Sequence, residues 1–211
     1  MSCCASRFRR RGCGFKKVCG GWDADSRLID SMVRTMSPST TFLFATGNGG
    51  PGYGTAHTPV DFTSVHVGAG TTMQYRYWLG YESDYDYTKW GDVIPFSNSG
   101  PTRQGKLNAE IIASGAYSME PAPLNQYAYG GLGDGSVHFQ LGSGTSHATP
   151  TVAGAVALGY EAYYIESGGW WPDFFTAKAK LMAAADDMHY DPFKQGAGWL
   201  NAFTYTNFMG Y

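Results

Sequence analysis

The sequence of 211 residues has few cysteines, few charged residues and no long apolar run, and each of these shortages excludes a class of protein. All four cysteines lie within residues 1–20, so disulfides do not hold the rest of the chain together. No run of about 18 apolar residues occurs, which excludes a membrane-spanning helix, and the N-terminus lacks the apolar core of a signal peptide. Charged residues make up only 15% of the chain, which is too few for a coiled coil.

Hydrophobic residues make up 43% of the chain, which indicates a folded protein rather than a disordered one, and the length suits one domain. Glycine is abundant, because its 29 residues are about twice the usual share of roughly 7%. The glycines follow no three-residue period, which excludes collagen, and they predict many tight turns and close backbone contacts.

Basic residues are concentrated at the start of the chain, where residues 1–20 hold six of the 15 and no acidic residue. The remainder has nine basic and 17 acidic residues, a net charge of −8, which argues against nucleic acid or an anionic membrane as the main partner. The cysteines form no C-x-x-C pair and no histidine follows at zinc-finger spacing, so a metal site there has little support. We expect residues 1–20 to lie outside the fold and residues 21–211 to form it.

The chain alternates between predicted helices and strands. Apolar residues four apart predict an amphipathic helix over residues 25–35, with Asp25 as its N-cap. The β-branched and aromatic residues 40–46 predict a buried strand that ends in a glycine-rich loop. Further strands are predicted at 64–67, 109–114 and 136–140, and further helices from 146 and over 174–185. This order predicts an α/β fold with a mainly parallel sheet flanked by helices.

Residues 72–92 are rich in aromatic and acidic side chains, which suits a substrate rim or a calcium loop as well as a surface hairpin. Asp84 and Asp86 alternate as calcium ligands do, but the glycine and the closing glutamate of an EF-hand are missing. We therefore favour a hairpin whose rings pack on the domain.

Ser146 stands where a glycine-rich turn enters a predicted helix that is small or apolar on nearly every face. Pro150 falls in the first turn, where a missing N–H costs little. At this place free backbone N–H groups and the positive end of the helix dipole favour an oxyanion beside the hydroxyl. The same placement also suits an ordinary N-cap serine, so geometry alone leaves both interpretations open.

The string Gly144-Thr-Ser-His-Ala-Thr-Pro-Thr-Val-Ala-Gly154 resembles the nucleophile segment of subtilisin-like serine proteases. The resemblance implies that Ser146 is the nucleophile and that the fold is subtilisin-like. Three weaker matches to the same family occur in the family's order, at residues 96–101, 109–115 and 195–202.

The segment Phe44-Ala-Thr-Gly-Asn-Gly-Gly-Pro51 resembles the strand of this family that ends in an asparagine whose amide donates into the oxyanion hole. That role would fall to Asn48, since the chemistry needs a neutral donor held rigidly at a strand end. By the same resemblance, Ala45, Thr46 and Gly47 would line one wall of the pocket for the residue before the scissile bond. Taken alone, the pair Gly47-Asn48 favours the interpretation of Asn48 as a left-handed turn residue.

The catalytic aspartate and histidine of this family precede the oxyanion asparagine, but the 47 residues before Asn48 contain no histidine and no Asp-x-Gly. The five histidines all follow it, out of family order, and we interpret them as strand, loop or helix residues; they are His57, His66, His138, His147 and His189. We therefore expect a subtilisin-like domain that is incomplete at the N-terminus.

The resemblance implies a serine-type endopeptidase that forms an acyl-enzyme on Ser146, inactive by itself because a serine without a base is a weak nucleophile. The alternatives are a catalytically dead fragment that only binds peptides, and an esterase with a different base. The expected partners are a polypeptide substrate and a missing N-terminal catalytic segment. No cofactor is identifiable, although calcium is common in the family. For this chain the sequence predicts no localisation, whereas the resemblance implies that the full-length protein is secreted or extracellular.

Overall fold

The computed structural model describes residues 21–57, 59–71, 91–116, 118–121 and 139–211. The predicted extra-domain segment 1–20, most of the aromatic segment 72–92 and His138 lie outside these residues.

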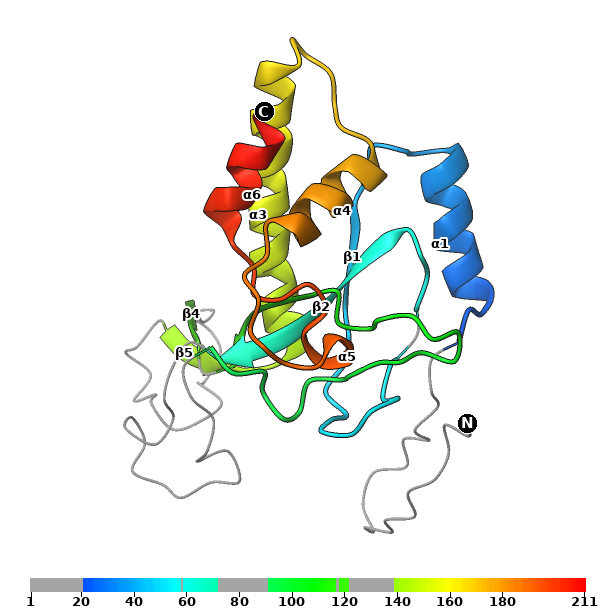
Figure 1. Ribbon diagram of the computed structural model, residues 1–211, viewed down its shortest axis with the longest axis vertical. Coiled ribbons are helices and arrows are strands. Elements are labelled where there is room, and N and C mark those ends of the chain that lie inside the picture. The colour runs from blue at the N-terminus through cyan, green and yellow to red at the C-terminus, as the bar shows by residue number, and fades with distance from the viewer. Residues whose placement is uncertain (1–20, 58, 72–90, 117, 122–138) are drawn as a thin grey trace.

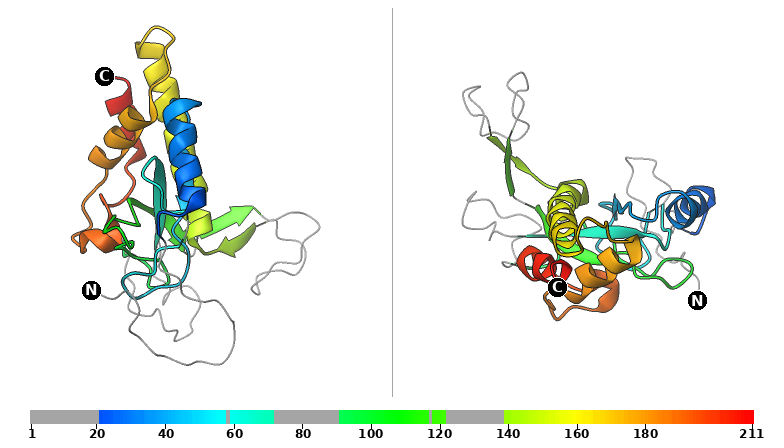
Figure 2. Two further views of the ribbon diagram at one scale, coloured as in Figure 1. Left: turned by 90° about the vertical axis from the view of Figure 1, so that its right-hand side faces the viewer. Right: turned by 90° about the horizontal axis from the view of Figure 1, so that it is seen from above.

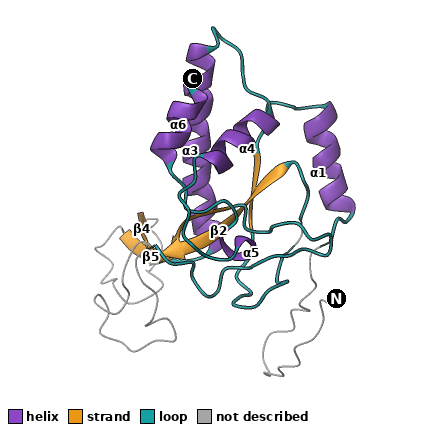
Figure 3. Ribbon diagram, in the orientation of Figure 1, coloured by secondary structure: helices purple, strands orange, loops and turns teal. Residues whose placement is uncertain are grey.

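Three parallel strands form the central sheet, in the order β1, β2, β3: β1 is Phe42–Ala45, β2 is Ser64–Thr71 and β3 is Ile111–Ala116. Phe42 pairs with Ser64, and Val67 pairs with Ile111. Helices surround this layer, as the predicted α/β class requires (Figure 1, Figure 3). β2 is buried along its whole length, whereas every residue of the edge strand β1 is only half-buried.

The prediction that the second strand ends near Gly68 was wrong, since β2 continues through Gly68 and Gly70 to Thr71. Glycine is needed inside this strand because neighbouring side chains approach its backbone closely. A β-carbon on Gly70 would lie 2.5 Å from Cζ3 of Trp199 and 2.9 Å from Cγ2 of Ile112. The glycine therefore marks a close packing contact rather than the end of a strand.

The long helix α3, Thr145–Glu166, contacts all three strands of the sheet. Its packed face carries small residues, among them Ala148, Val152 and Ala155. The small and apolar residues on nearly every face of this segment predicted a buried helix, which was wrong, because part of its surface is exposed: Leu158 is 54% exposed and Ile165 is 67% exposed. Apart from the backbone of α3 itself, no atom of the described residues lies within 4 Å of the position that a β-carbon on Gly154 would take.

The other helices of the described residues are α1 (Ala24–Thr35), α4 (Phe174–Ala183), the short α5 (Pro192–Gln195) and α6 (Ala202–Met209). The two views of Figure 2 show them arranged around the sheet, and α6 packs on α3 and α4. The N-cap of α1 is Asp23, whose side chain accepts a hydrogen bond from Ser26 N, and not Asp25, which lies in the first turn. A further pair of antiparallel strands, β4 (Ser118–Pro121) and β5 (Phe139–Gly142), leads into α3.

None of the described helices has both the length and the hydrophobicity that a bilayer-spanning helix requires.

Candidate active site

The carboxyl ends of β1 and β3 meet the amino end of α3 at one edge of the sheet. Gly144 N donates to Gly115 O near the end of β3, at 2.6 Å, and Gly47 N beyond β1 donates to Thr145 Oγ1 at 3.1 Å. Ligand sites in open α/β sheets lie at this edge. The two segments that the sequence singles out, around residues 48 and 146, are thus brought together here.

Ser146 is the second residue of α3 and its side chain is exposed. The N-cap is Gly144, with φ of 145°, so the interpretation of Ser146 as an N-cap was wrong. No described residue hydrogen-bonds to the Ser146 hydroxyl, and no described acceptor takes its backbone N–H. Both groups lie in the first turn of α3, at the positive end of the helix dipole.

Asn48 is exposed and lies against the first turn of α3. Its Oδ1 accepts two hydrogen bonds from Thr145, one from the backbone N and one from Oγ1, each 2.9 Å long. Because the carboxamide is planar, this contact fixes the direction of Nδ2, which donates to no described residue. The left-handed turn residue here is Gly47, with φ of 97°, so that interpretation of Asn48 was wrong.

The three residues predicted to line a pocket wall precede this asparagine. Ala45 ends β1 and is half-buried, Thr46 is fully buried and Gly47 is half-buried. The exposed His57 lies beside them, with its Cβ 3.6 Å from the position of a β-carbon on Gly47.

Two residues at this site were missed as functional candidates in the sequence. Thr145 is fully buried and links Gly47 N to Asn48 Oδ1 through its hydroxyl. Asn98 is 3% exposed and holds the backbone on both sides of Asn48. Both lie inside motifs that the family resemblance picks out, at 144–154 and 96–101, but those strings do not tell which side chains bond to the loop at 46–49.

The sequence profile of the Subtilase family, peptidase S8, matches residues 11–203, which include both segments of this site. The chain belongs to the subtilase family. The match begins within residues 1–20, and our expectation that this segment lies outside the fold stays a prediction.

This subtilase chain is 29% identical over 199 residues to pyrolysin of Pyrococcus furiosus, covering 88% of the chain and 12% of pyrolysin. It is 26% identical over 184 residues to tripeptidyl-peptidase 2 of Caenorhabditis elegans, covering 84% of the chain and 12% of that protein. The chain therefore spans about an eighth of the length of these relatives.

Among solved structures, the fold resembles a lanthipeptide protease, with a TM-score of 0.65, 19% identity, and coverage of 88% of this chain and 55% of the other. It also resembles the prenylagaramide maturation protease PagA, with a TM-score of 0.61, 24% identity, and coverage of 90% and 58%. These likenesses show that the α/β fold is subtilisin-like, as predicted, and that it forms part of such a domain.

The histidine in β2 of this subtilase belongs to a buried charged cluster rather than to the serine site. His66 is 1% exposed; its Nε2 donates to Pro59 O at 2.9 Å, and its Nδ1 lies 3.1 Å from both Glu110 Oε2 and Lys106 Nζ. Lys178 Nζ contacts Glu110 Oε1 at 2.6 Å. Burial by itself raises the pKa of Glu110, but the hydrogen bond with His66 and the charges of Lys178 and Lys106 lower that pKa to about 2.

Two other described histidines, His189 and His147, are not placed as a base for Ser146. His189 is exposed and lies 3.3 Å from Asp187 Oδ2. His147 follows Ser146 on the helix, and adjacent helical residues do not face each other.

Within the described ranges, no group of three or more His, Cys, Asp or Glu residues is arranged to hold a metal ion. Calcium therefore remains an expectation from the family alone, without a set of ligands.

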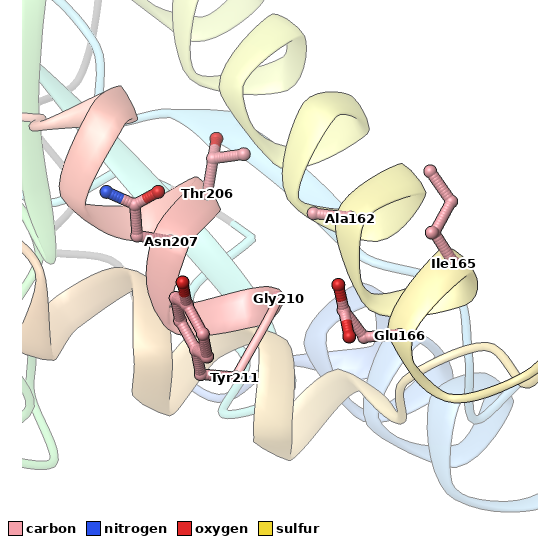
Figure 4. A pocket seen from close by; sticks show the side chains of 7 residues that line it. All are labelled: Ala162, Ile165, Glu166, Thr206, Asn207, Gly210 and Tyr211. Carbon is pink, nitrogen blue, oxygen red and sulfur yellow. The ribbon is translucent and has the colours of Figure 1, made fainter.

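A hollow of about 290 Å³ lies at the other end of α3, between its last turns and the end of α6 (Figure 4). Ile165, Thr206 and Tyr211 are among the residues that line it. A helix of 22 residues is about 33 Å long, so this hollow lies far from Ser146.

Proposed function

We propose that this chain is the part of a serine endopeptidase domain that carries the nucleophile, Ser146, and the oxyanion hole. The observation that carries the proposal is the pair of hydrogen bonds from Thr145 to Asn48 Oδ1, which aligns the Asn48 amide beside the start of α3. The substrate is a polypeptide, and Ala45, Thr46 and Gly47 form one wall of the pocket for the residue before the scissile bond.

In the proposed reaction, Ser146 Oγ attacks the peptide carbonyl carbon while a general base takes the hydroxyl proton. The carbonyl oxygen becomes an oxyanion, which accepts hydrogen bonds from the Ser146 backbone N–H and from Asn48 Nδ2. The C–N bond then breaks, the base gives its proton to the leaving amine, and water hydrolyses the ester on Ser146 in the second half of the reaction.

We propose that the general base and its carboxylate come from a separate N-terminal catalytic segment. Residues 1–47 contain no histidine, and two of the described histidines, His66 and His189, contact Glu110 and Asp187 instead of Ser146. The half-buried strand β1 and the exposed apolar face of α3, with Leu158 and the open space at Gly154, support a partner segment that packs there. Without the base, kcat is expected to fall by a factor of about 10⁶.

Labelling by a fluorophosphonate probe tests the proposal, since the probe reacts with an activated serine. The rate at the 211-residue chain is expected to be slow and to rise as imidazole is added as an external base. Ser146→Ala is expected to abolish labelling, and Asn48→Ala to slow it by about 100-fold, because one oxyanion donor is lost. Labelling that persists in Ser146→Ala would overturn the proposed nucleophile.

A second candidate function is a peptide-binding fragment without chemistry, which is favoured by the lack of any described imidazole bonded to Ser146. It predicts that added imidazole does not accelerate labelling, while a peptide still binds. A third candidate, an esterase with another base, is tested by the hydrolysis of an activated ester. This candidate predicts that the Asn48→Ala variant still hydrolyses the ester.

A further inference from the structure

Asn98 is a buried amide that bonds to the backbone on both sides of Asn48. It lies in the segment between β2 and β3 and is 3% exposed. Its Nδ2 donates to Thr46 O at 2.7 Å, and its Oδ1 accepts from Gly49 N at 2.6 Å. Its own backbone N donates to Gly47 O at 3.0 Å. One residue thus contacts the three loop residues that flank Asn48.

The loop is shaped to admit this amide. A β-carbon on Gly47 would lie 2.5 Å from Asn98 Nδ2, and one on Gly49 would lie 2.9 Å from Asn98 Oδ1. Any other residue at either position would displace the Asn98 side chain. The glycines on both sides of Asn48 are therefore explained by the packing of Asn98, in addition to the positive φ of Gly47.

Thr145 and Asn98 hold different parts of Asn48. Thr145 bonds to the side-chain oxygen, which sets the rotation of the carboxamide. Asn98 bonds only to main-chain groups at residues 46, 47 and 49, which set the place of the Asn48 backbone. An oxyanion donor acts only if it is held at hydrogen-bond distance, about 2.7 to 3.1 Å, from the oxygen on which the charge develops. Both the rotation of the carboxamide and the place of the Asn48 backbone must therefore be fixed.

We propose that Asn98 is a positioning residue of the oxyanion hole, which acts on the reaction through Asn48 without touching the substrate. This inference rests on the proposed function. Removing the Asn98 side chain leaves the Thr46 carbonyl and the Gly49 N–H without partners in a buried place, so the loop shifts to regain hydrogen bonds and moves the Asn48 amide with it.

The test measures fluorophosphonate labelling of Ser146 in the full chain with added imidazole. Asn98→Ala is expected to lower the rate by about 10- to 100-fold, close to the effect of Asn48→Ala. Asn98→Asp keeps the acceptor for Gly49 N but not the donor to Thr46 O, and its decrease is expected to be smaller. Asn108→Ala is the matched control. Asn108 is also a buried asparagine in the segment between β2 and β3, but its side chain makes no hydrogen bond to a described residue.

The double variant Asn48→Ala/Asn98→Ala separates positioning from general destabilisation. If Asn98 acts through Asn48, the second substitution has no further effect on the rate, whereas independent effects multiply. Multiplying effects, or an unchanged rate in Asn98→Ala when Asn48→Ala is slow, would overturn the inference. An unchanged rate in Asn48→Ala itself would overturn the proposed function, and the inference with it. If Asn98→Ala does not fold, the same cycle with Asn98→Asp decides.

Discussion

The buried carboxylate of Glu110 gives a stability prediction whose size follows from the structure. Glu110 is 4% exposed and contacts Lys178, Lys106 and His66 at 2.6, 3.4 and 3.1 Å. A pKa lowered from 4.5 to about 2 corresponds to about 3 kcal/mol of stabilisation at neutral pH. Burial also lowers the pKa of Lys106, which shows that the charged ammonium is penalised and offsets part of this gain. We expect Glu110→Gln to destabilise the fold by about 2 to 3 kcal/mol at pH 7.

The stabilisation of the fold by Glu110 is expected to weaken as the pH falls. Because the pKa of Glu110 is lower in the folded chain than its ordinary value of 4.5, its stabilisation is fully present above that value and is lost as the pH falls toward about 2. The difference between wild type and Glu110→Gln is therefore expected to shrink to about 1 kcal/mol at pH 3.

Urea titration at low protein concentration, followed by tryptophan fluorescence at pH 7 and pH 3, measures this difference. Glu166→Gln is the control, because Glu166 is exposed at the end of α3 and its substitution is expected to change stability by less than about 0.5 kcal/mol. A difference between wild type and Glu110→Gln that is equal at both pH values would refute the reasoning.

Three further substitutions test other contacts. Thr145→Val removes the hydroxyl that joins Gly47 N to Asn48 Oδ1 and is expected to slow Ser146 labelling by about 10-fold. Thr145→Ser keeps the hydroxyl and is expected to change the labelling rate little. Tyr205→Phe is expected to leave the urea midpoint unchanged or raise it, because the Tyr205 hydroxyl is buried without a described hydrogen-bond partner. Gly70→Ala is expected to lower the free energy of unfolding by about 1 to 3 kcal/mol, because the new methyl group would collide with the ring of Trp199. An unchanged free energy of unfolding would show that the ring moves freely.

The family motifs predicted which two segments meet, because Asn48 and Ser146 lie in strings of fixed identities. The alternation of predicted helices and strands also predicted a mainly parallel sheet, and the residue pattern predicted most of α1 and α4. These features depend on local patterns, which a single sequence contains.

The errors arose where distant residues override a local signal. Gly68 suggests a strand end, but a β-carbon there would lie 2.6 Å from Ile112 Cδ1, so the close approach of this side chain makes glycine a packing requirement in β2. The apolar pattern of α3 predicted burial on every side, whereas the described sheet covers only one face. The bonds of Asn98 join residues about 50 positions apart, and no periodicity reports such pairs.

The hydrogen bonds between Asn48 and Thr145 join residues 97 positions apart in the chain. Their geometry depends on the alignment of β1, β2 and β3, because β1 sets the place of one partner and β3, through Gly115, sets the place of the other. Reactivity of the serine should therefore appear late in folding and disappear early in unfolding, which makes the labelling rate a sensitive gauge of strand alignment across the sheet.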